Sequence, residues 1–181
     1  MINTFVAIYV DGYQPYKWHE DITIGKEFEI KLKISPTIYS ALERILTLRK
    51  KDNTGRSRPV IQFYFLSGTA SERRIVFTNQ DDVYGNGIDE IKYHLTSDPH
   101  IPINAWTELS MKQYESQGKY WYEISVNGSI IHKAENPQPV VRTGLTLNRG
   151  GAGQGSAMKG YIKDVTIRKG EFLSSSLFSF Y

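Results

Sequence analysis

Apolar and polar residues alternate with a period of two along most of this chain, and no other feature constrains its fold as strongly. In segment 28–34 the apolar residues Phe28, Ile30, Leu32 and Ile34 alternate with charged ones. Successive side chains of a β-strand point to opposite faces, so this segment is predicted to be a strand with one buried face. Comparable runs predict further strands at 60–66, 74–78, 106–112, 120–126, 129–133, 143–147 and 160–168.

The residues between these runs indicate an antiparallel arrangement. Asn127 and Gly128 stand between two predicted strands. Both residues tolerate the positive φ that a two-residue type I′ hairpin turn requires. Many short strands separated by turn residues predict an all-β fold, built as a two-sheet antiparallel β-sandwich.

One segment departs from the period of two. The Ser-Pro pair at 35–36 is a helix start signal, and the apolar residues that follow are spaced like one face of a helix. Local propensity therefore favours a short helix near 37–44. Residues 45–48 fit a strand equally well, and the sequence leaves both interpretations open.

Composition excludes several classes of protein. The 181 residues include 40% hydrophobic and 23% charged residues and no cysteine, which excludes disulfides, thiolate zinc sites and cysteine nucleophiles. The net charge of +3 is too small to predict nucleic-acid binding, and no apolar run is long enough to predict membrane insertion. Without a change in composition, we expect one domain over 1–181, with its core at 20–170 and flanking segments at 1–19 and 171–181.

Several segments follow one another in an order that is typical of a known group of β-sandwich domains. A tryptophan lies in segment 102–110, a tyrosine-rich strand leads to an Asn-Gly turn in 118–128, and Gly-Tyr-Ile begins segment 160–167. Together with the early strands at 25–32 and 57–63, this order resembles the concanavalin A-like jelly-roll superfamily, nearest to its laminin-G-like and galectin-like branches. The resemblance implies a lectin-like jelly roll that recognises a ligand without transforming it.

The resemblance does not extend to the galectin sugar motif, and a second, shorter resemblance lies near the N-terminus. The galectin sugar motif His-x-Asn-x-Arg is absent, so no ligand residue is carried over. Segment 10–15, Val-Asp-Gly-Tyr-Gln-Pro, is similar to the entry of the galectin-like head of rotavirus attachment spikes. The resemblances imply an extracellular, cell-surface or virion-surface protein that binds a glycan or glycoprotein for attachment, displayed in several copies in a larger protein.

Side chains outside the predicted core are candidate ligand contacts, because aromatic faces stack on sugar C–H surfaces and polar groups bind hydroxyls. An N-terminal aromatic cluster, a basic loop at 49–58 and the start of a glycine-rich segment provide them. The candidates are Tyr13, Tyr16, Trp18, Arg56, Arg58, Trp121, Asn148 and Arg149. Trp121 alternates with the inward-facing tyrosines and is expected on an exposed face, whereas Trp106 is expected in the core.

Two other functions remain open. Asp81, Asp82, Asn86 and Asp89 could supply oxygen ligands for Ca²⁺, which would suit a laminin-G-type module that binds other proteins; no further cofactor is expected. The third function is an unusual glycoside hydrolase. Such an enzyme needs two carboxylates facing one another across a cleft. The Glu-x-Asp-x-x-Glu signature of sandwich hydrolases is absent from the sequence, so we expect no enzyme.

Overall fold

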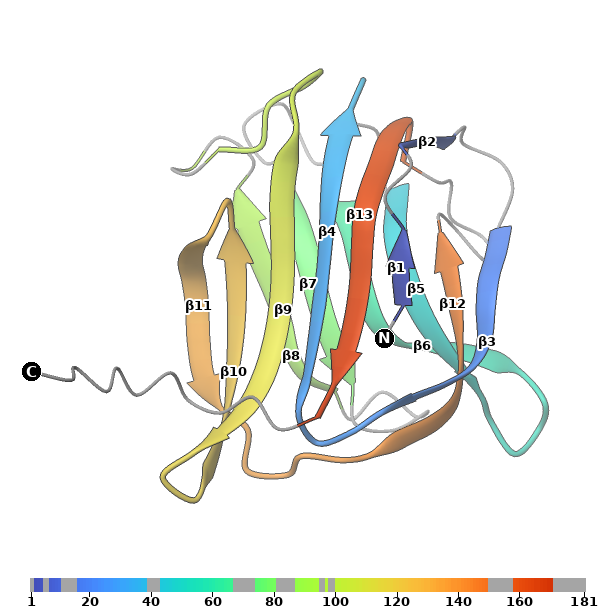
Figure 1. Cartoon of the computed structure of the whole chain (residues 1–181), viewed down its shortest axis with the longest axis vertical. Coiled ribbons are helices and arrows are strands. Elements are labelled where there is room, and N and C mark those ends of the chain that lie inside the picture. Colours follow the sequence, from blue (N-terminus) through green and yellow to red (C-terminus); the bar gives the residue numbers. More distant parts are fainter. Residues whose placement is uncertain are drawn as a thin grey trace, which may run out of the picture.

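The chain forms two stacked antiparallel sheets, and its described part contains no helix (Figure 1). The structure, a computed structural model, describes residues 2–4, 7–10, 16–38, 43–66, 74–80, 87–94, 97, 100–149 and 158–170. At 2–4, 8, 16–18, 80, 87–92, 94 and 149 it describes the backbone alone. No helix among these residues could cross a lipid bilayer. The predicted all-β, two-sheet sandwich is confirmed.

Sheet A faces the viewer in Figure 1 and has seven strands. Its order is β1-β13-β4-β9-β10-β11, and β2 also pairs with β13. The strands are β1 (Ile2–Thr4), β2 (Ile8–Val10), β4 (Phe28–Pro36), β9 (Thr107–Ser116), β10 (Lys119–Val126), β11 (Ser129–Glu135) and β13 (Gly160–Lys169).

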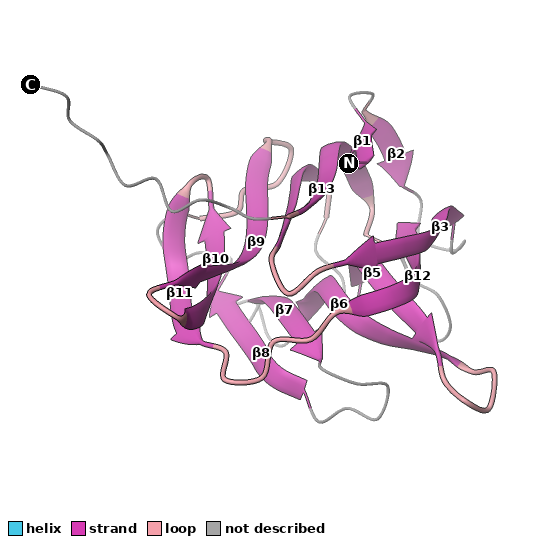
Figure 2. Ribbon diagram, turned by 60° about the horizontal axis from the view of Figure 1, so that its bottom comes forward, coloured by secondary structure: helices cyan, strands magenta, loops and turns pink. Residues whose placement is uncertain are grey.

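Sheet B has six strands, in the order β3-β12-β5-β6-β7-β8. Figure 2 shows the two layers from another side, with β9, β10 and β11 in one and β5, β6 and β12 in the other. The strands are β3 (Tyr16–Ile24), β5 (Glu43–Lys51), β6 (Ser57–Leu66), β7 (Arg74–Gln80), β8 (Gly87–His94) and β12 (Arg142–Arg149).

The core lies between the sheets and is made by the inward residue of each alternating pair. Phe28 and Ile30 of β4 have no exposed surface, and neither do Phe63 and Phe77 of sheet B. The rings of Phe63 and Phe77 meet edge to face, with their centroids 5.3 Å apart. Each buried side chain of this size contributes about 1.5–3 kcal/mol through the apolar surface it removes from water. Alternation in the sequence therefore identified the inner face correctly.

Two glycine turns fix the register of β9, β10 and β11. Asn127 and Gly128 have φ angles of 49° and 80°, so the predicted two-residue turn between β10 and β11 is confirmed. Gln117 and Gly118, with φ angles of 55° and 72°, make the equivalent turn between β9 and β10. This second turn carries the same left-handed geometry, and the sequence analysis did not identify it.

The proposed helix near 37–44 is not supported by the residues that the structure describes. Glu43 and Arg44 already belong to β5, and residues 39–42 lie outside the described part of the chain. The strand at 45–48 is confirmed, because β5 lies between β12 and β6 and its backbone groups pair with both neighbours. Pairing on two sides outweighs the local helix propensity, which amounts to only about a few tenths of a kcal/mol per residue.

The segment expected to flank the core at its N-terminal end takes part in both sheets. Residues 2–4 and 8–10 pair with β13, and 16–19 belong to β3, which pairs with β12. The flanking segment 171–181 lies outside the described residues.

Gly160 lies where β13 approaches the end of β4. Its φ of 148° is unfavourable for other residues, and a Cβ there would overlap the carbonyl oxygen of Ser35 and lie 2.8 Å from Cα of Pro36. Both neighbouring atoms belong to the backbone of a paired strand, so neither can move without disturbing the ladder.

We expect Gly160→Ala to lower the free energy of unfolding by about 2 kcal/mol or more, because strain and overlap add. The matched control is Gly170→Ala, which has a similar φ of 127° but open space around its Cβ position. The control introduces the backbone strain without the overlap, so it should cost less than Gly160→Ala. Equal losses for the two variants in denaturant unfolding would contradict the close approach.

Candidate functional site

The outward face of sheet A carries polar side chains in register across β4, β9 and β10. Ser110 of β9 lies opposite Ser125 of β10 on one side and Lys31 of β4 on the other. The next row along the strands joins Lys112 to Glu123. Two short serine side chains between longer charged ones leave a hollow on this face.

This hollow, which we call the serine groove, has a volume of about 260 Å³. Ser110 and Ser125 lie in its middle row, and Ile130 of β11 lies opposite Ser125. Among the described residues, the groove is lined by Glu29, Lys31, Glu108, Ser110, Lys112, Glu123, Ser125, Gly128 and Ile130.

Charges around the serine groove are arranged in pairs. Lys31 Nζ lies 3.4 Å from Glu108 Oε1, and Lys133 Nζ lies 2.8 Å from Glu123 Oε1. Glu29 Oε2 lies 3.7 Å from the guanidinium of Arg168. Pairing holds carboxylate acceptors and ammonium donors in place at the rim. It also keeps the local field small, so the groove has no strong preference for a charged ligand.

Three side chains at one end of the groove form a closed hydrogen-bond cluster. Tyr114 donates its hydroxyl proton to Glu123 Oε1 at 2.6 Å, and Lys133 Nζ donates to the Tyr114 oxygen at 2.7 Å. Burial alone would raise the pKa of Glu123, but hydrogen bonds from Lys133 and Tyr114 outweigh it and lower this pKa. The hydrogen bond to Glu123 raises the pKa of Lys133 to about 12. Both groups are therefore held charged at neutral pH.

Trp121 borders this cluster. It lies opposite Tyr114 on the outward face of β10, half-buried, and the Lys133 ammonium is 5.1 Å from the centre of its ring. The exposed-face position expected from alternation is thus observed. Its role as a ligand contact stays a prediction.

Several other predicted ligand residues come together on sheet B. Register pairs Asn148 with Lys17 and Arg149 with Tyr16, and Trp18 is on the same strand, β3. These positions lie on the opposite sheet from Trp121, so the predicted residues do not form one site. Tyr13 lies outside the described residues.

Asn148 belongs to a buried polar row on the outward face of sheet B. Register aligns Asn148, Thr47, Gln62 and Thr78 across four neighbouring strands, and each has 8% or less of its surface exposed. Gln62 donates to the Thr78 hydroxyl at 3.3 Å. A row this buried presents little surface to a ligand. In the serine groove Ser110 is also buried, at 6% exposed, but Ser125 and the charged residues around it are partly exposed.

Arg56 and Arg58 lie at the tip of the β5–β6 hairpin, which is ordered by Asp52. The Asp52 carboxylate accepts hydrogen bonds from the backbone N–H groups of Thr54 and Arg56 and from the Thr54 hydroxyl. Its second oxygen lies 3.2 Å from Arg58 Nε. These bonds, the Thr54 hydroxyl foremost, lower the pKa of Asp52 to about 2.

The predicted calcium ligands are only partly described. Asp81, Asp82 and Asn86 lie outside the described residues, and the backbone of Asp89 lies opposite Asn79 on β7. Within the described ranges no group of three or more His, Asp or Glu side chains is placed to hold a metal ion. Calcium binding stays a prediction.

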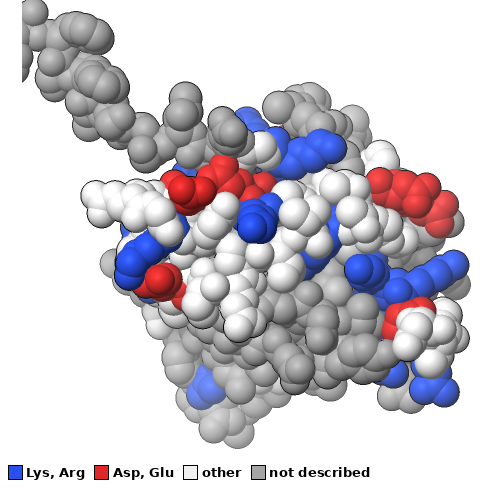
Figure 3. All heavy atoms as spheres, turned by 90° about the horizontal axis from the view of Figure 1, so that it is seen from below, with Lys and Arg blue, Asp and Glu red and all other residues white. Residues whose placement is uncertain are grey.

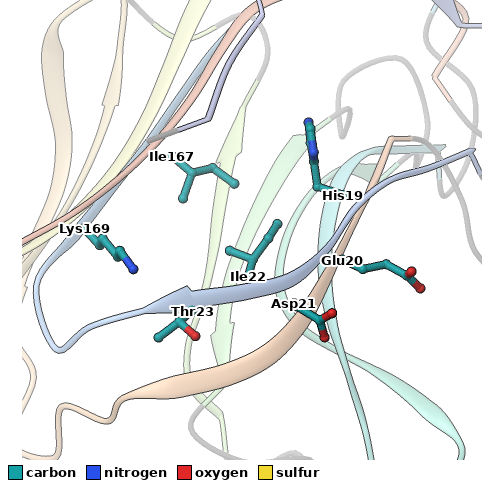
Figure 4. A pocket seen from close by; sticks show the side chains of 7 residues that line it. All are labelled: His19, Glu20, Asp21, Ile22, Thr23, Ile167 and Lys169. Carbon is teal, nitrogen blue, oxygen red and sulfur yellow. The ribbon is translucent and has the colours of Figure 1, made fainter.

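A second hollow, of about 300 Å³, lies at the seam where β3 passes β13 (Figure 4). Ile22 and Ile167 are buried there, and the side chains of Glu20 and Asp21 point away from Lys169. The carboxylates of this hollow therefore do not converge on a common point. The described residues that line it are His19, Glu20, Asp21, Ile22, Thr23, Ile167 and Lys169.

The structure corrects one expectation about tryptophan. Trp106 is 41% exposed rather than part of the core, and the Lys163 ammonium lies 4.0 Å from its ring centre. Trp106 directly precedes β9, so it lies at the end of the sheet and not between the layers. Tyr9 and Tyr161, which the sequence analysis did not select, are also exposed and meet edge to face at 5.1 Å. Their alternation with buried neighbours was the signal that could have identified them.

Comparisons with known proteins agree on the fold. No protein-family model matches the chain, and no curated protein matches it in sequence. Among solved structures, it is similar to domain 4 of AbnA, an extracellular arabinanase of Geobacillus stearothermophilus in complex with arabinotriose. That match has a TM-score of 0.59 and 14% identity, and covers 91% of this chain and 70% of the other.

Two further structures are similar. The CBM40 of a Ruminococcus gnavus sialidase, bound to α2,3-sialyllactose, has a TM-score of 0.56 and 12% identity, covering 90% of this chain and 94% of the other. Domains LG4-5 of the mouse laminin α1 chain have a TM-score of 0.55 and 14% identity, covering 91% of this chain and 38% of that one. These structural matches support the two-sheet jelly-roll fold that the sequence predicted.

Lys133→Met tests the cluster at the end of the groove. Loss of the ammonium removes a hydrogen bond and a positive charge from Glu123, so the pKa of Glu123 should rise, as measured by NMR titration of its carboxyl carbon. Lys119→Met is the matched control, since it breaks the exposed 2.8 Å pair with Glu135 instead. An unchanged Glu123 titration in Lys133→Met would contradict the hydrogen-bonded cluster.

Asp52→Asn tests the order of the β5–β6 hairpin. The pKa of Asp52 is lowered from 3.8 to about 2, so its ionised form stabilises the fold above the unfolded-state pKa. The advantage of the wild type over the variant should be complete above about pH 5 and shrink as the pH falls toward about 2. Denaturant unfolding across this range measures it. A difference that stays constant would show that the Asp52 carboxylate is not held in this way.

Proposed function

We propose that this domain is a non-catalytic carbohydrate-binding module in an extracellular or surface protein, and that the serine groove holds an uncharged oligosaccharide during attachment. The observation that carries the proposal is the open groove on sheet A, with small hydroxyl side chains in its middle row and fixed donors and acceptors along its rim. Hydroxyl, carboxylate and ammonium groups can hydrogen-bond to a hydroxyl-bearing ligand, whereas an apolar ligand would leave them without partners.

The rim chemistry matches sugar hydroxyls. A hydroxyl both donates and accepts, and the groove offers both partners in its two ion pairs, Lys31–Glu108 and Lys133–Glu123. Each of the three carboxylates that line the groove has a cationic partner: Glu29 lies beside Arg168, Glu108 beside Lys31 and Glu123 beside Lys133. This balance favours an uncharged ligand.

Trp121 extends the site beyond the groove. On β10 it is four residues from Ser125, which corresponds to about 13 Å along a strand. A ligand that contacts Ser125 and also stacks on Trp121 must therefore be longer than a single sugar ring. Such a shallow site gives weak single-site affinity, and display of several copies would raise the overall strength of attachment.

We propose no catalysis because Glu123 does not have the raised pKa that a glycosidase general acid needs. A glycosidase general acid needs a raised pKa so that it holds a proton at working pH. Hydrogen bonds lower the pKa of Glu123, which suits an acceptor and not a proton donor. The similarity of the fold to an arabinanase domain in complex with arabinotriose and to a module bound to sialyllactose supports sugar recognition outside the cell.

A glycan array probed with a multimerised full chain tests the proposal. We expect retained glycans to be uncharged and at least two sugars long, and Ser125→Tyr to weaken their binding about tenfold or more by filling the groove. Thr146→Tyr is the matched control, because residue 146 lies half-buried on β12 of the opposite sheet, beside Arg49. Both variants are compared only if their unfolding midpoints match the wild type.

Two results would contradict this assignment. One is an array without hits at any multivalency. The other is glycan binding that is retained in Ser125→Tyr but lost in Thr146→Tyr. That result would mean that the binding site lies on sheet B.

A further inference from the structure

The β5–β6 hairpin is the most strongly basic segment of the described surface. Residues 49–58 read Arg-Lys-Lys-Asp-Asn-Thr-Gly-Arg-Ser-Arg, with five positive side chains and one negative. The hairpin projects at the lower right of Figure 1, and Figure 3, seen from below, shows Lys and Arg side chains gathered on that side. This contrasts with the serine groove, where charges of both signs are balanced.

The single acidic residue of the hairpin does not neutralise its surface. The Asp52 side chain is only 4% exposed, and its oxygens accept hydrogen bonds from within the hairpin. The side chains of Lys50, Lys51 and Arg56 have no ion-pair partner in the described part of the chain. Asp52 therefore orders the loop while the positive charge remains at the surface.

Like charges are held close together at the base of the hairpin. Arg49 Nε donates to the Ser57 hydroxyl at 2.9 Å, which fixes its guanidinium against the neighbouring strand. Burial, followed by repulsion from Arg44 and Arg58, lowers the pKa of Arg49. An arrangement that crowds positive groups costs free energy in the unbound protein, and an anionic ligand would relieve that cost.

The charges point to both faces of the hairpin. Lys50 lies opposite Arg58 in register, and Lys51 lies opposite Ser57, one position along. Neighbouring residues of a strand face opposite sides, so Lys50 and Arg58 share one face while Lys51 and Arg49 share the other. A flexible polyanion can contact both faces at once, and a flat surface can contact only one.

The chemistry of the hairpin also narrows the class of partner. Residues 49–58 contain no aromatic or aliphatic side chain. A protein interface needs apolar or aromatic anchors at its centre, and single-stranded nucleic acid needs aromatic rings on which bases stack. Guanidinium and ammonium groups without such anchors suit sulfate and carboxylate groups.

We propose that the β5–β6 hairpin is a second binding site, independent of the serine groove, which takes a sulfated polysaccharide. Arg56 and Lys51, both exposed, make the first ionic contacts, and Lys50 and Arg58 extend them along one face. Four ionic contacts should make the affinity fall about 50- to 150-fold between about 0.05 M and 0.2 M NaCl.

The test measures binding of the full chain to heparin by calorimetry over this salt range. The triple variant Lys50→Ser, Lys51→Ser and Arg56→Ser should lose about tenfold or more of the affinity and most of the salt dependence. These side chains make none of the hydrogen bonds that order the loop, so folding should be retained. The matched control replaces the exposed Lys119, Lys159 and Lys169 with serine, giving the same change in net charge elsewhere.

Each outcome is decisive. Equal losses in the two triple variants would overturn the proposal, because attraction would then depend on net charge alone. Equal affinity for poly-glutamate or duplex DNA would overturn it in favour of another class of polyanion. Selective loss in the hairpin variant, with weaker binding to both of those probes, supports it. Binding of uncharged glycans at the serine groove should be unchanged in either variant, which separates this test from that of the proposed function.

Discussion

Burial of two apolar sheet faces against each other is the interaction on which the rest of this structure depends. Because alternation has a period of two, each residue that enters the core fixes the direction of its neighbours. Ile124 points inward with no exposed surface, so Glu123 and Ser125 must point outward. The serine groove is therefore a consequence of core packing, since it consists of the outward residues of strands whose inward residues hold the sheets together.

Charged side chains are arranged differently on sheet A and on the β5–β6 hairpin. On sheet A each of the three carboxylates that line the groove has a cationic neighbour, as in the Lys133–Glu123 pair, and the charges of this face largely offset one another. On the β5–β6 hairpin the one carboxylate, Asp52, is turned inward to organise the loop. The described part of the molecule thus has one surface with paired charges and one with unpaired positive charge, and we propose that the two bind ligands of different chemistry.

Local patterns predicted the strands well and the sites only in part. The period of two and the Asn127-Gly128 turn were sufficient for the sandwich, because both act between residues close in sequence. The helix expected near 37–44 is not supported where the structure describes that segment, because Glu43 and Arg44 belong to β5, whose pairing with strands on both sides outweighs local propensity. Trp106 was misplaced for a related reason: hydrophobicity predicts burial on average, but position at the end of a strand decides whether a second layer covers it.

The sequence by itself determined which side chains share a face of each strand, and it predicted the turn at Asn127-Gly128. The turn at Gln117-Gly118, which places Ser110 and Ser125 in one row, was found only in the structure. Only the tertiary structure decided that Lys31 completes the same row, and that Trp121 and Asn148 lie on opposite sheets. The physical reason is that alternation and turn geometry are local, whereas the pairing of strands distant in sequence depends on how the whole core packs.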